Sequence, residues 1–500
     1  MIRPSPVPRL RLGRPAAALL ASLGLLAAAC GAPPSAGTGA AQSTANATEK
    51  TLPPCPLAAL AKATGTVNVN LWYGGLGGAT QSTMEDMAKR FNASQRKVVV
   101  SANNEGASYD EVLRKYKGAA ATPSQLPGVI YLEDTALGEM VDRGQVLPAE
   151  SCMRADHFDV NQIIPGARAS WSVNGVVWPG YINVSTPMLY INKAHFQKAG
   201  LDPEKPPRTL DEIYQAAKVI KAKGVATKPF ILSLKRWFFE TWLGGIDEPM
   251  VNNGNGHLKP ATAAVFDTPE ARAMLELFVK MKREGLINIF PNTPGSIDHY
   301  LALIAKPPVS SMLIETSAAA TTIRGALSGQ ITAKAGGLDL GSGSLSTADL
   351  VPGGGAFPGI RQPGKIHPSG GAFYILNTQS PAQQAASWEF LKFMLQPQNI
   401  TQWYLNGSYQ PIVASVAKQP GVQKFFQSDV AGVLLKPAYQ QFVGADPRQP
   451  QPLIGPSQDF TLIVEKMLDD VMLNNADPVT TLSRAQADAT KLLTDYNGGH

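Results

Sequence analysis

The chain has few of the residues that build metal sites and nucleophilic catalytic centres. Among its 500 residues are three cysteines and six histidines, and the histidines are scattered along the sequence. They are His157, His195, His257, His299, His367 and His500. No His-Glu-x-x-His, Cys-x-x-Cys or Gly-x-Ser-x-Gly motif occurs. These absences argue against a metalloenzyme and a serine hydrolase, and we expect neither metal nor cofactor.

The apolar run at the N-terminus, Ala16 to Ala29, is too short to cross a membrane. Arginines precede it and small residues follow, which is the layout of a secretory signal peptide over residues 1–29. The run Leu26-Ala-Ala-Ala-Cys30 resembles the bacterial lipoprotein cleavage box, which predicts a lipid on Cys30. We therefore expect an exported protein anchored to the outer face of the cell membrane, or periplasmic. An ordinary signal peptidase site near the same alanines is the alternative.

The segment after Cys30 lacks large apolar residues up to Lys50, so residues 30–65 are expected to form a flexible tether. With Cys30 lipidated, Cys55 and Cys152 are the remaining thiols. Export to an oxidising compartment favours a disulfide between them. The alternative is two separately buried small hydrophobic residues.

Charge is sparse and nearly balanced. Charged residues make up 16% of the chain, and the formal net charge is +6. Loss of the four arginines in residues 1–29 leaves 40 basic residues against 38 acidic ones, a balance of +2. No nucleic-acid partner is implied. Hydrophobic residues make up 44%, which suffices for globular cores, and the length allows two or three domains.

Strand and helix patterns alternate in the first part of the chain. Residues Thr66–Trp72 alternate as a strand, a helix carries apolar positions from Met84 to Phe91, and Lys97–Ser101 is again strand-like. A second unit pairs a helix at Tyr109–Ala119 with a buried strand at Gly128–Leu132. Such units favour an α/β fold with a parallel sheet.

In the next part of the chain, the signals for where helices start and end are clearer. Residues Pro187–Ile191 are β-rich, and Ala194–Ala199 form a short helix that ends at Gly200. Thr209 caps a further helix, with Glu212 three residues on as a capping box.

Two more helix starts carry a cap residue followed by proline, at Thr268-Pro269 and Ser380-Pro381; Gln383 completes a capping box at the second. The region from Gly336 to Pro368 is rich in glycine, proline and serine, including Gly353-Gly-Gly355. We interpret it as surface loop, since no phosphate-binding glycine motif occurs in it.

Aromatic residues gather in the run from Lys235 to Trp242, which holds Trp237, Phe238 and Phe239. An indole face offers an apolar platform to a sugar, a polyol or a choline-like cation. Core packing is the alternative for each ring. Further stacking or packing candidates are Trp171, Trp178, Tyr181, Trp403 and Tyr404. Carboxylate pairs of glycosidase type can be posed at Glu133-Asp134 or Asp298 with Glu315, although sequence does not place them.

Residues 66–490 resemble the family 1 extracellular solute-binding proteins that feed ABC importers. Within that family the resemblance is to the Ugp-type glycerol-3-phosphate and glycerophosphodiester binding proteins, and more distantly to maltose-binding protein. The run Ser185–Ile213 is the most specific match. Supporting runs are Met87–Asn92, Ser108–Val112, Pro127–Asp134, Gly370–Ala372 and Gly407–Ile412.

The resemblance implies an α/β, two-lobed type II periplasmic-binding-protein fold with a hinge between the lobes and ligand in the cleft. The expected lobe I takes residues 66–182 and 329–405, and lobe II takes 183–328 and 406–500.

Carried over residue by residue, the resemblance places the ligand-binding positions on hydroxyl, carboxylate, indole and glycine residues. They are Tyr109, Asp134, Ser185, Trp237, Ser317, Gly370, Gly371 and Tyr409. Hydroxyl and backbone donors with a carboxylate acceptor suit a polyol.

Two departures from the Ugp type bear on the ligand. The late loop Leu453–Phe460 lacks the phosphate-clamping arginine, and Arg448 lies upstream. The position three before Trp237 is Leu234, where the family has a second tryptophan. The missing arginine favours a neutral sugar or polyol.

The resemblance implies a monomeric, non-enzymatic binding protein that captures a sugar, polyol or glycerophosphodiester and delivers it to the membrane subunits of an ABC permease. Two rival hypotheses remain open: an exported glycoside hydrolase that uses the same aromatic platform, and a cell-surface adhesion or signalling module.

Overall fold

The computed structural model describes residues 43–293, 296–329, 340–362 and 365–499. The expected signal peptide, the lipidation of Cys30 and the start of the tether lie outside the described residues. Within the described ranges, no helix combines the length and apolarity needed to cross a membrane.

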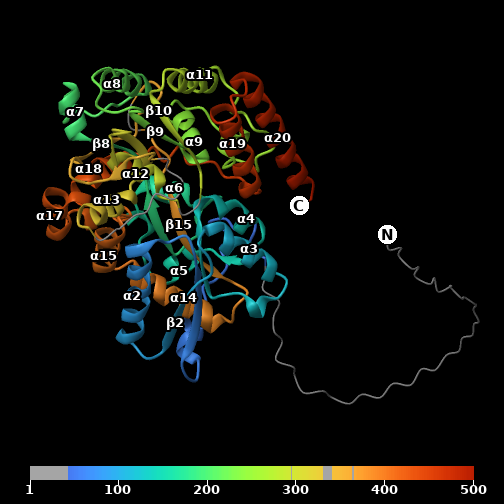
Figure 1. Cartoon of the computed structure of the whole chain (residues 1–500). Coiled ribbons are helices and arrows are strands. Elements are labelled where there is room, and N and C mark those ends of the chain that lie inside the picture. The colour runs from blue at the N-terminus through green and yellow to red at the C-terminus, as the bar shows by residue number, and fades with distance from the viewer. Residues whose placement is uncertain (1–42, 294–295, 330–339, 363–364, 500) are drawn as a thin grey trace, which may run out of the picture. The chain divides into compact units, whose positions relative to one another are not determined.

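The first sheet has the strand order β2-β1-β3-β15-β4, and β7 pairs with β15. Its strands are β1 (Val67–Tyr73), β2 (Val98–Asn104), β3 (Val129–Glu133), β4 (Val146–Leu147), β7 (Tyr181–Ser185) and β15 (Ser369–Leu376). The first three are parallel, as the strand-helix-strand pattern predicted, whereas β15 runs antiparallel to β3. The helices α2 (Gly78–Ser94), α3 (Tyr109–Ala119) and α14 (Pro381–Met394) pack on this sheet (Figure 1).

The second sheet has the order β10-β9-β12-β8-β14. Its strands are β8 (Pro187–Asn192), β9 (Phe230–Leu234), β10 (Ile287–Pro291), β12 (Met312–Thr316) and β14 (Pro352–Ala356). One buried core joins it to α7 (Lys193–Ala199), α8 (Leu210–Ala222), α9 (Arg236–Gly244), α11 (Pro269–Arg283), α19 (Ser457–Met472) and α20 (Pro478–Gly498). Figure 1 draws α8 and α11 above the second sheet, α19 and α20 to its right, and the first sheet below it.

The sequence signals for helix ends are mostly confirmed. Helix α7 stops where Gly200 adopts φ 79°. Thr268 and Ser380 cap their helices with proline in the first turn, and Ser380 with Gln383 forms a full capping box. The box at Thr209 is only half formed. Thr209 accepts the amide of Glu212, but the Glu212 carboxylate accepts the amide of Arg208 instead.

The expectation of a loop at Gly353-Gly-Gly355 is wrong, because these glycines form the middle of strand β14. Strand β14 lies between β8 and helix α18 (Val430–Val443). A Cβ atom at Gly354 would lie 2.8 Å from the carbonyl oxygen of Leu434 in α18, and one at Gly355 would lie 2.8 Å from Pro206. Gly354 is needed because the backbone of α18 rests directly on the strand, and Gly355 leaves room for Pro206.

Strand β14 also bears on the expected lobes. It falls in the range 329–405 assigned to lobe I, yet it pairs with β8 of the second sheet. The other lobe boundaries stay a prediction.

Between β7 and β8, the chain passes from the first sheet to the second through one residue. Strand β7 ends at Ser185 in the first sheet, and β8 begins at Pro187 in the second. Thr186 between them is fully buried. The apolar core of the first sheet extends to Met188 and Tyr190 of β8, so buried contacts connect the two sheets.

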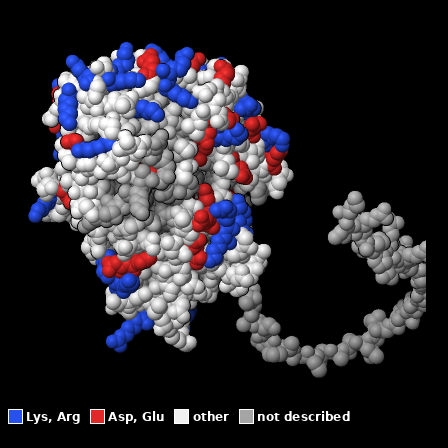
Figure 2. Space-filling model, viewed as in Figure 1, with Lys and Arg blue, Asp and Glu red and all other residues white. Residues whose placement is uncertain are grey.

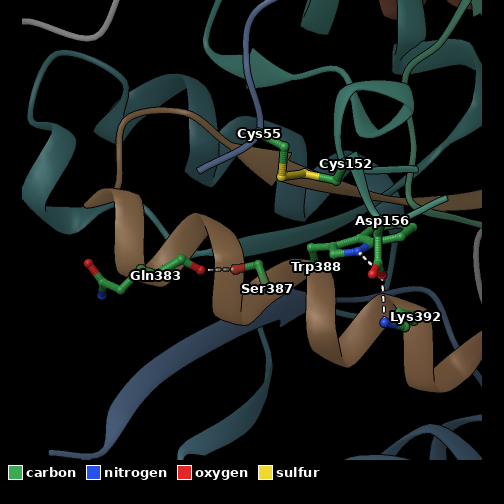
Figure 3. The surroundings of a disulfide bond; sticks show 7 residues. All are labelled: Cys55, Cys152, Asp156, Gln383, Ser387, Trp388 and Lys392. Carbon is green, nitrogen blue, oxygen red and sulfur yellow. Dashed lines mark hydrogen bonds and ion pairs between the residues drawn. A yellow bond between two sulfur atoms is a disulfide. The ribbon is translucent and has the colours of Figure 1, made fainter. Parts of the chain in front are cut away.

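The N-terminal part of the described chain is linked to the first sheet's core by a disulfide between Cys55 and Cys152 (Figure 3). Cys152 lies in α5 (Ala149–Ala155), and Cys55 precedes α1 (Leu57–Lys62). Close by, the indole of Trp388 donates to Asp156 at 2.9 Å, and Lys392 pairs with the same carboxylate at 2.6 Å. The two α14 side chains thus fix the turn that follows α5.

Candidate functional site

The carboxyl end of β3 carries two acidic residues, Glu133 and Asp134. Strand β15 lies alongside, with Gly371 opposite Glu133. The Asp134 carboxylate accepts a hydrogen bond from the Ser369 hydroxyl at 2.9 Å and a longer one from the Gly370 amide at 3.5 Å. The start of β15 therefore fixes Asp134 at the edge of the first sheet.

A group of tyrosines lies next to this edge. Tyr109 is the first residue of α3, and its hydroxyl lies 3.3 Å from that of Tyr131 in β3. Tyr131 in turn accepts a hydrogen bond from Asn183 of β7 at 2.7 Å. Tyr409 lies next to these tyrosines. Burial raises the pKa of Tyr409, and a hydrogen bond with Tyr109 lowers it. The structure thus brings Tyr109 and Tyr409 together beside Glu133, the residue before Asp134.

The two glycines predicted for the site make room for this arrangement. A Cβ atom on Gly371 would lie 2.1 Å from the Tyr131 ring. Gly370 has φ 137°, and a Cβ there would lie 1.9 Å from the carbonyl oxygen of Asn183. Neither position has space for a side chain.

Helix α9 of the second sheet's core adds a buried ion pair that the sequence did not single out. Arg236 and Glu240, one turn apart, lie 3.4 Å from each other and are 5% and 2% exposed. Burial raises the pKa of Glu133, and the charge of Asp134 raises it further. Burial likewise raises the pKa of Asp134, and the charge of Glu240 raises it further. The charge of Arg236 lowers the pKa of both groups. Burial also raises the pKa of Glu240 to about 7. The carboxyl groups of Glu133, Asp134 and Glu240 thus share one guanidinium, which also lowers the pKa of Glu465.

The position of Trp237 separates it from the other aromatic residues of its run. Phe238, Phe239 and Trp242 are buried in the second core. Trp237 is half-buried, and its indole N–H donates to the carbonyl oxygen of His367 at 3.1 Å. One ring of the run is therefore available as a platform, whereas the others pack. The other aromatic candidates are also buried: Trp171, Trp178, Tyr181, Trp403 and Tyr404.

The two serines assigned to the site hold the crossing between the sheets. The Ser185 hydroxyl donates to the Ser369 carbonyl at 3.2 Å. The Ser317 hydroxyl accepts the amide of Thr186 at 3.1 Å, and the Ser317 amide donates to the Thr186 carbonyl at 2.7 Å. Ser317 is fully buried. In this arrangement Ser317 presents no surface to a ligand.

The posed pair of Asp298 and Glu315 has another explanation. Glu315 is fully buried and pairs with Lys235 at 2.6 Å and with His299 at 2.9 Å. Although burial opposes ionisation, these two partners hold the pKa of Glu315 at about 2. A carboxylate bound in this way is a structural anion. No cluster of three metal-ligating side chains occurs among the described residues.

Sequence reasoning missed Tyr131, Arg236 and Glu240. Arg236 and Glu240 flank Trp237 at a spacing of four residues, which places them on one helix face. That spacing was the available signal, although it does not reveal that both side chains are buried.

Comparisons with known proteins identify the class. The model for bacterial extracellular solute-binding proteins matches residues 86–431, and the chain belongs to this family. The two-sheet α/β architecture is the type II periplasmic-binding-protein fold, shared with two-domain sugar-binding proteins. The chain is a solute-binding protein of the kind that serves ABC importers, and not an enzyme.

The individual relatives have low sequence identity to this chain. The sn-glycerol-3-phosphate-binding periplasmic protein UgpB of Brucella abortus is 26% identical over 368 residues, which cover 72% of this chain and 78% of that protein. The cyclic alpha-maltosyl-1,6-maltose binding protein of Arthrobacter globiformis has a TM-score of 0.67 at 20% identity, covering 86% of this chain and 100% of that one. UgpB of Mycobacterium tuberculosis, solved with glycerophosphocholine, has a TM-score of 0.67 at 16% identity, covering 87% and 100%.

The buried carboxyl groups predict a pH dependence of stability. Glu240 has a pKa of about 7 in the folded protein against an ordinary value of 4.5. Its favourable contribution is complete below pH 4.5 and is lost as the pH rises towards 7, because the unfolded chain gives up the proton first. Glu240→Gln removes this loss. The variant should gain stability relative to wild type by about 1.4 kcal/mol per pH unit within that window.

Urea unfolding at pH 5, 6, 7 and 8 measures the difference between the two proteins. Glu276→Gln, a change on the exposed face of α11, is the matched control and should show no such trend. Burial lowers the pKa of His367 to about 4, which makes the free energy of unfolding rise with pH. Both proteins contain His367, so this effect cancels in the difference between them. A difference between Glu240→Gln and wild type that stays constant with pH would contradict the assignment.

Proposed function

We propose that this protein binds a neutral sugar or polyol at the place where β3, β15 and α9 meet, and delivers it to an ABC permease. The observation that carries the proposal is the grouping of Tyr109 and Tyr409 with Glu133. The Glu133 carboxyl group shares Arg236, the neighbour of the half-buried Trp237, with Asp134 and Glu240. Hydroxyl and carboxyl groups that can donate and accept match the hydroxyls of a polyol, and an indole face matches its C–H groups.

The charge at the site supports a ligand without phosphate. Arg236 is already shared by the carboxyl groups of Glu133, Asp134 and Glu240, so its guanidinium is not free to clamp a phosphate. Arg448, the arginine nearest in sequence to the late loop, has its side chain 86% exposed and pairs with Asp446 at 2.7 Å. Two of the relatives are named for binding sn-glycerol-3-phosphate and cyclic alpha-maltosyl-1,6-maltose, each for its own protein. The second of these ligands is the neutral type that we propose here.

The site geometry also bears on the adhesion hypothesis. An adhesion module with an empty, closed cleft predicts a buried Trp237 and tyrosines on separate surfaces. Trp237 is half-buried, and Tyr109 and Tyr409 adjoin each other, which favours a ligand site.

Export and attachment complete the proposal. Residues 1–29 direct secretion, Cys30 carries a lipid, and the segment after Cys30 tethers the two-lobed body to the membrane. The expected tether over residues 30–65 is too long, because Thr44 and Ala47 are already buried and Cys55 is bonded to Cys152 of the first core. The protein acts as a monomer whose lobes close on the ligand, because contacts from both sheets are complete only in the closed state.

A binding assay tests the ligand class. Protein lacking residues 1–30 is screened by thermal shift with ribitol, maltose, glycerol-3-phosphate and glycerophosphocholine, and hits are measured by calorimetry. A neutral member should raise the melting temperature, and Trp237→Ala should weaken its binding at least tenfold, since the stacking surface is lost.

Leu258→Ala is the control for this substitution, because Leu258 is an exposed side chain away from the site. It should leave affinity unchanged. Binding of the anionic phosphate alone would overturn the neutral ligand class, and equal affinity of Trp237→Ala and wild type would overturn the site.

A further inference from the structure

A cavity of about 460 Å³ lies beside the proposed site. Its walls are α12 (Asp298–Leu301), the short helix Ala302–Ile304, α13 (Ala319–Leu327) and the segment 345–350. The apolar part of the lining includes Leu303, Ile304, Ile323, Leu345 and Leu350. This volume is in the range of pockets that hold small organic ligands.

The lining of the cavity is uncharged. Its polar atoms are hydroxyls, from Tyr300, Thr322, Ser346 and Thr347. An ion would lose its hydration there without gaining a partner of opposite charge, whereas an apolar group would lose contact with water at no such cost. By contrast, charged side chains of both signs lie on the outer surface that Figure 2 shows.

Two features connect the cavity with the proposed site. Helix α13 begins two residues after Ser317, at the crossing between the sheets, and lines the cavity with Thr322, Ile323 and Ala326. Tyr300 lines the cavity from the opposite wall, and Tyr409 of the site is close enough to contribute to the raised pKa of the Tyr300 hydroxyl. Tyr300 and Tyr409 therefore link the cavity with the site.

We propose that this cavity is a second subsite that receives an apolar alkyl or aryl group. The solute is then a sugar or polyol that bears such a substituent, and this part of the inference rests on the proposed function. The polar part occupies the site near Asp134, and the apolar part lies against Leu303, Ile323 and Leu350.

The first test uses N-phenyl-1-naphthylamine, an uncharged apolar dye that fluoresces on leaving water. The wild-type protein lacking residues 1–30 should bind it saturably. Ala326→Trp places an indole in the cavity from the half-buried face of α13 and should weaken dye binding at least tenfold. Ala93→Trp, on the exposed face of α2, is the matched control and should bind as wild type does.

A second variant guards against a folding defect. Leu350→Asp puts a charge into the cavity wall and should weaken dye binding in a protein whose circular dichroism and melting temperature confirm folding. Unchanged binding by both folded variants, or the absence of saturable dye binding to wild type, would overturn the proposal.

The second test uses methyl, hexyl and octyl β-D-glucosides below micelle-forming concentrations as competitors of the dye. The hexyl and octyl compounds should displace it at least tenfold better than the methyl compound, and Ala326→Trp should remove this advantage. Equal potency across the series would overturn the proposal. Failure of the whole polyol panel with intact dye binding would instead refute the proposed function and leave the cavity assigned.

Discussion

Replacing Gly370 by alanine is expected to lower the free energy of unfolding by about 3 kcal/mol or more and to abolish ligand binding. The backbone there has φ 137°, which strains any residue with a Cβ. The added methyl group would also lie 1.9 Å from the carbonyl oxygen of Asn183 in the neighbouring strand β7. Since β7 and β15 are paired at this point, the substitution forces the strands apart and displaces the amide that contacts Asp134.

Gly118→Ala is the matched control. Gly118 is exposed in α3, and a Cβ there meets nothing within 4 Å. Alanine favours a helix more than glycine does, so this variant should be stabilised by about 0.5–1 kcal/mol. Urea denaturation and calorimetry with the hit from the polyol panel measure both variants. Equal stability of the two would contradict the role given to Gly370.

Removal of the disulfide is expected to cost about 4 kcal/mol of stability. The bond joins residues separated by 97 positions, and closing so long a loop restricts the unfolded chain strongly. The effect on the folded state is local, because α1 after Cys55 contains no fully buried residue. The double variant Cys55→Ser/Cys152→Ser should therefore keep its ligand affinity while unfolding at lower urea.

Reduction supplies the internal control. Wild type with a reducing agent should unfold at the same urea concentration as the double variant, and the double variant should not respond to the agent. Coincident curves for oxidised wild type and the double variant would show that the bond does not stabilise the fold.

Local signals in the sequence were sufficient for much of the fold. The cap at Ser380 and the stop at Gly200 depend on neighbours a few residues away, so their patterns identify them. The run Gly353-Gly-Gly355 misled because its cause is distant. Leu434 and Pro206 approach this strand from other parts of the chain, and no local pattern records that contact.

The site shows the same division. Tyr109 and Tyr409 were named through resemblance and lie together in the structure, next to Glu133. Asp134, named in the same way, follows Glu133 and is held by Ser369. Ser317 was named in the same way, but it is fully buried at the crossing. Arg236 and Glu240 escaped notice because their importance follows from burial beside other carboxyl groups, which only the assembled fold creates.

The single-residue passage at Thr186 limits how the two sheets can rotate against each other. Ser185 belongs to one hydrogen-bonded sheet and Pro187 to the other, and both amide and carbonyl of Thr186 are engaged by Ser317. At this crossing, a rotation of one sheet against the other must use the backbone torsion angles of very few residues. The free-energy cost of such a rotation therefore depends on how strongly the backbone of Thr186 is held, as well as on the contacts of the ligand.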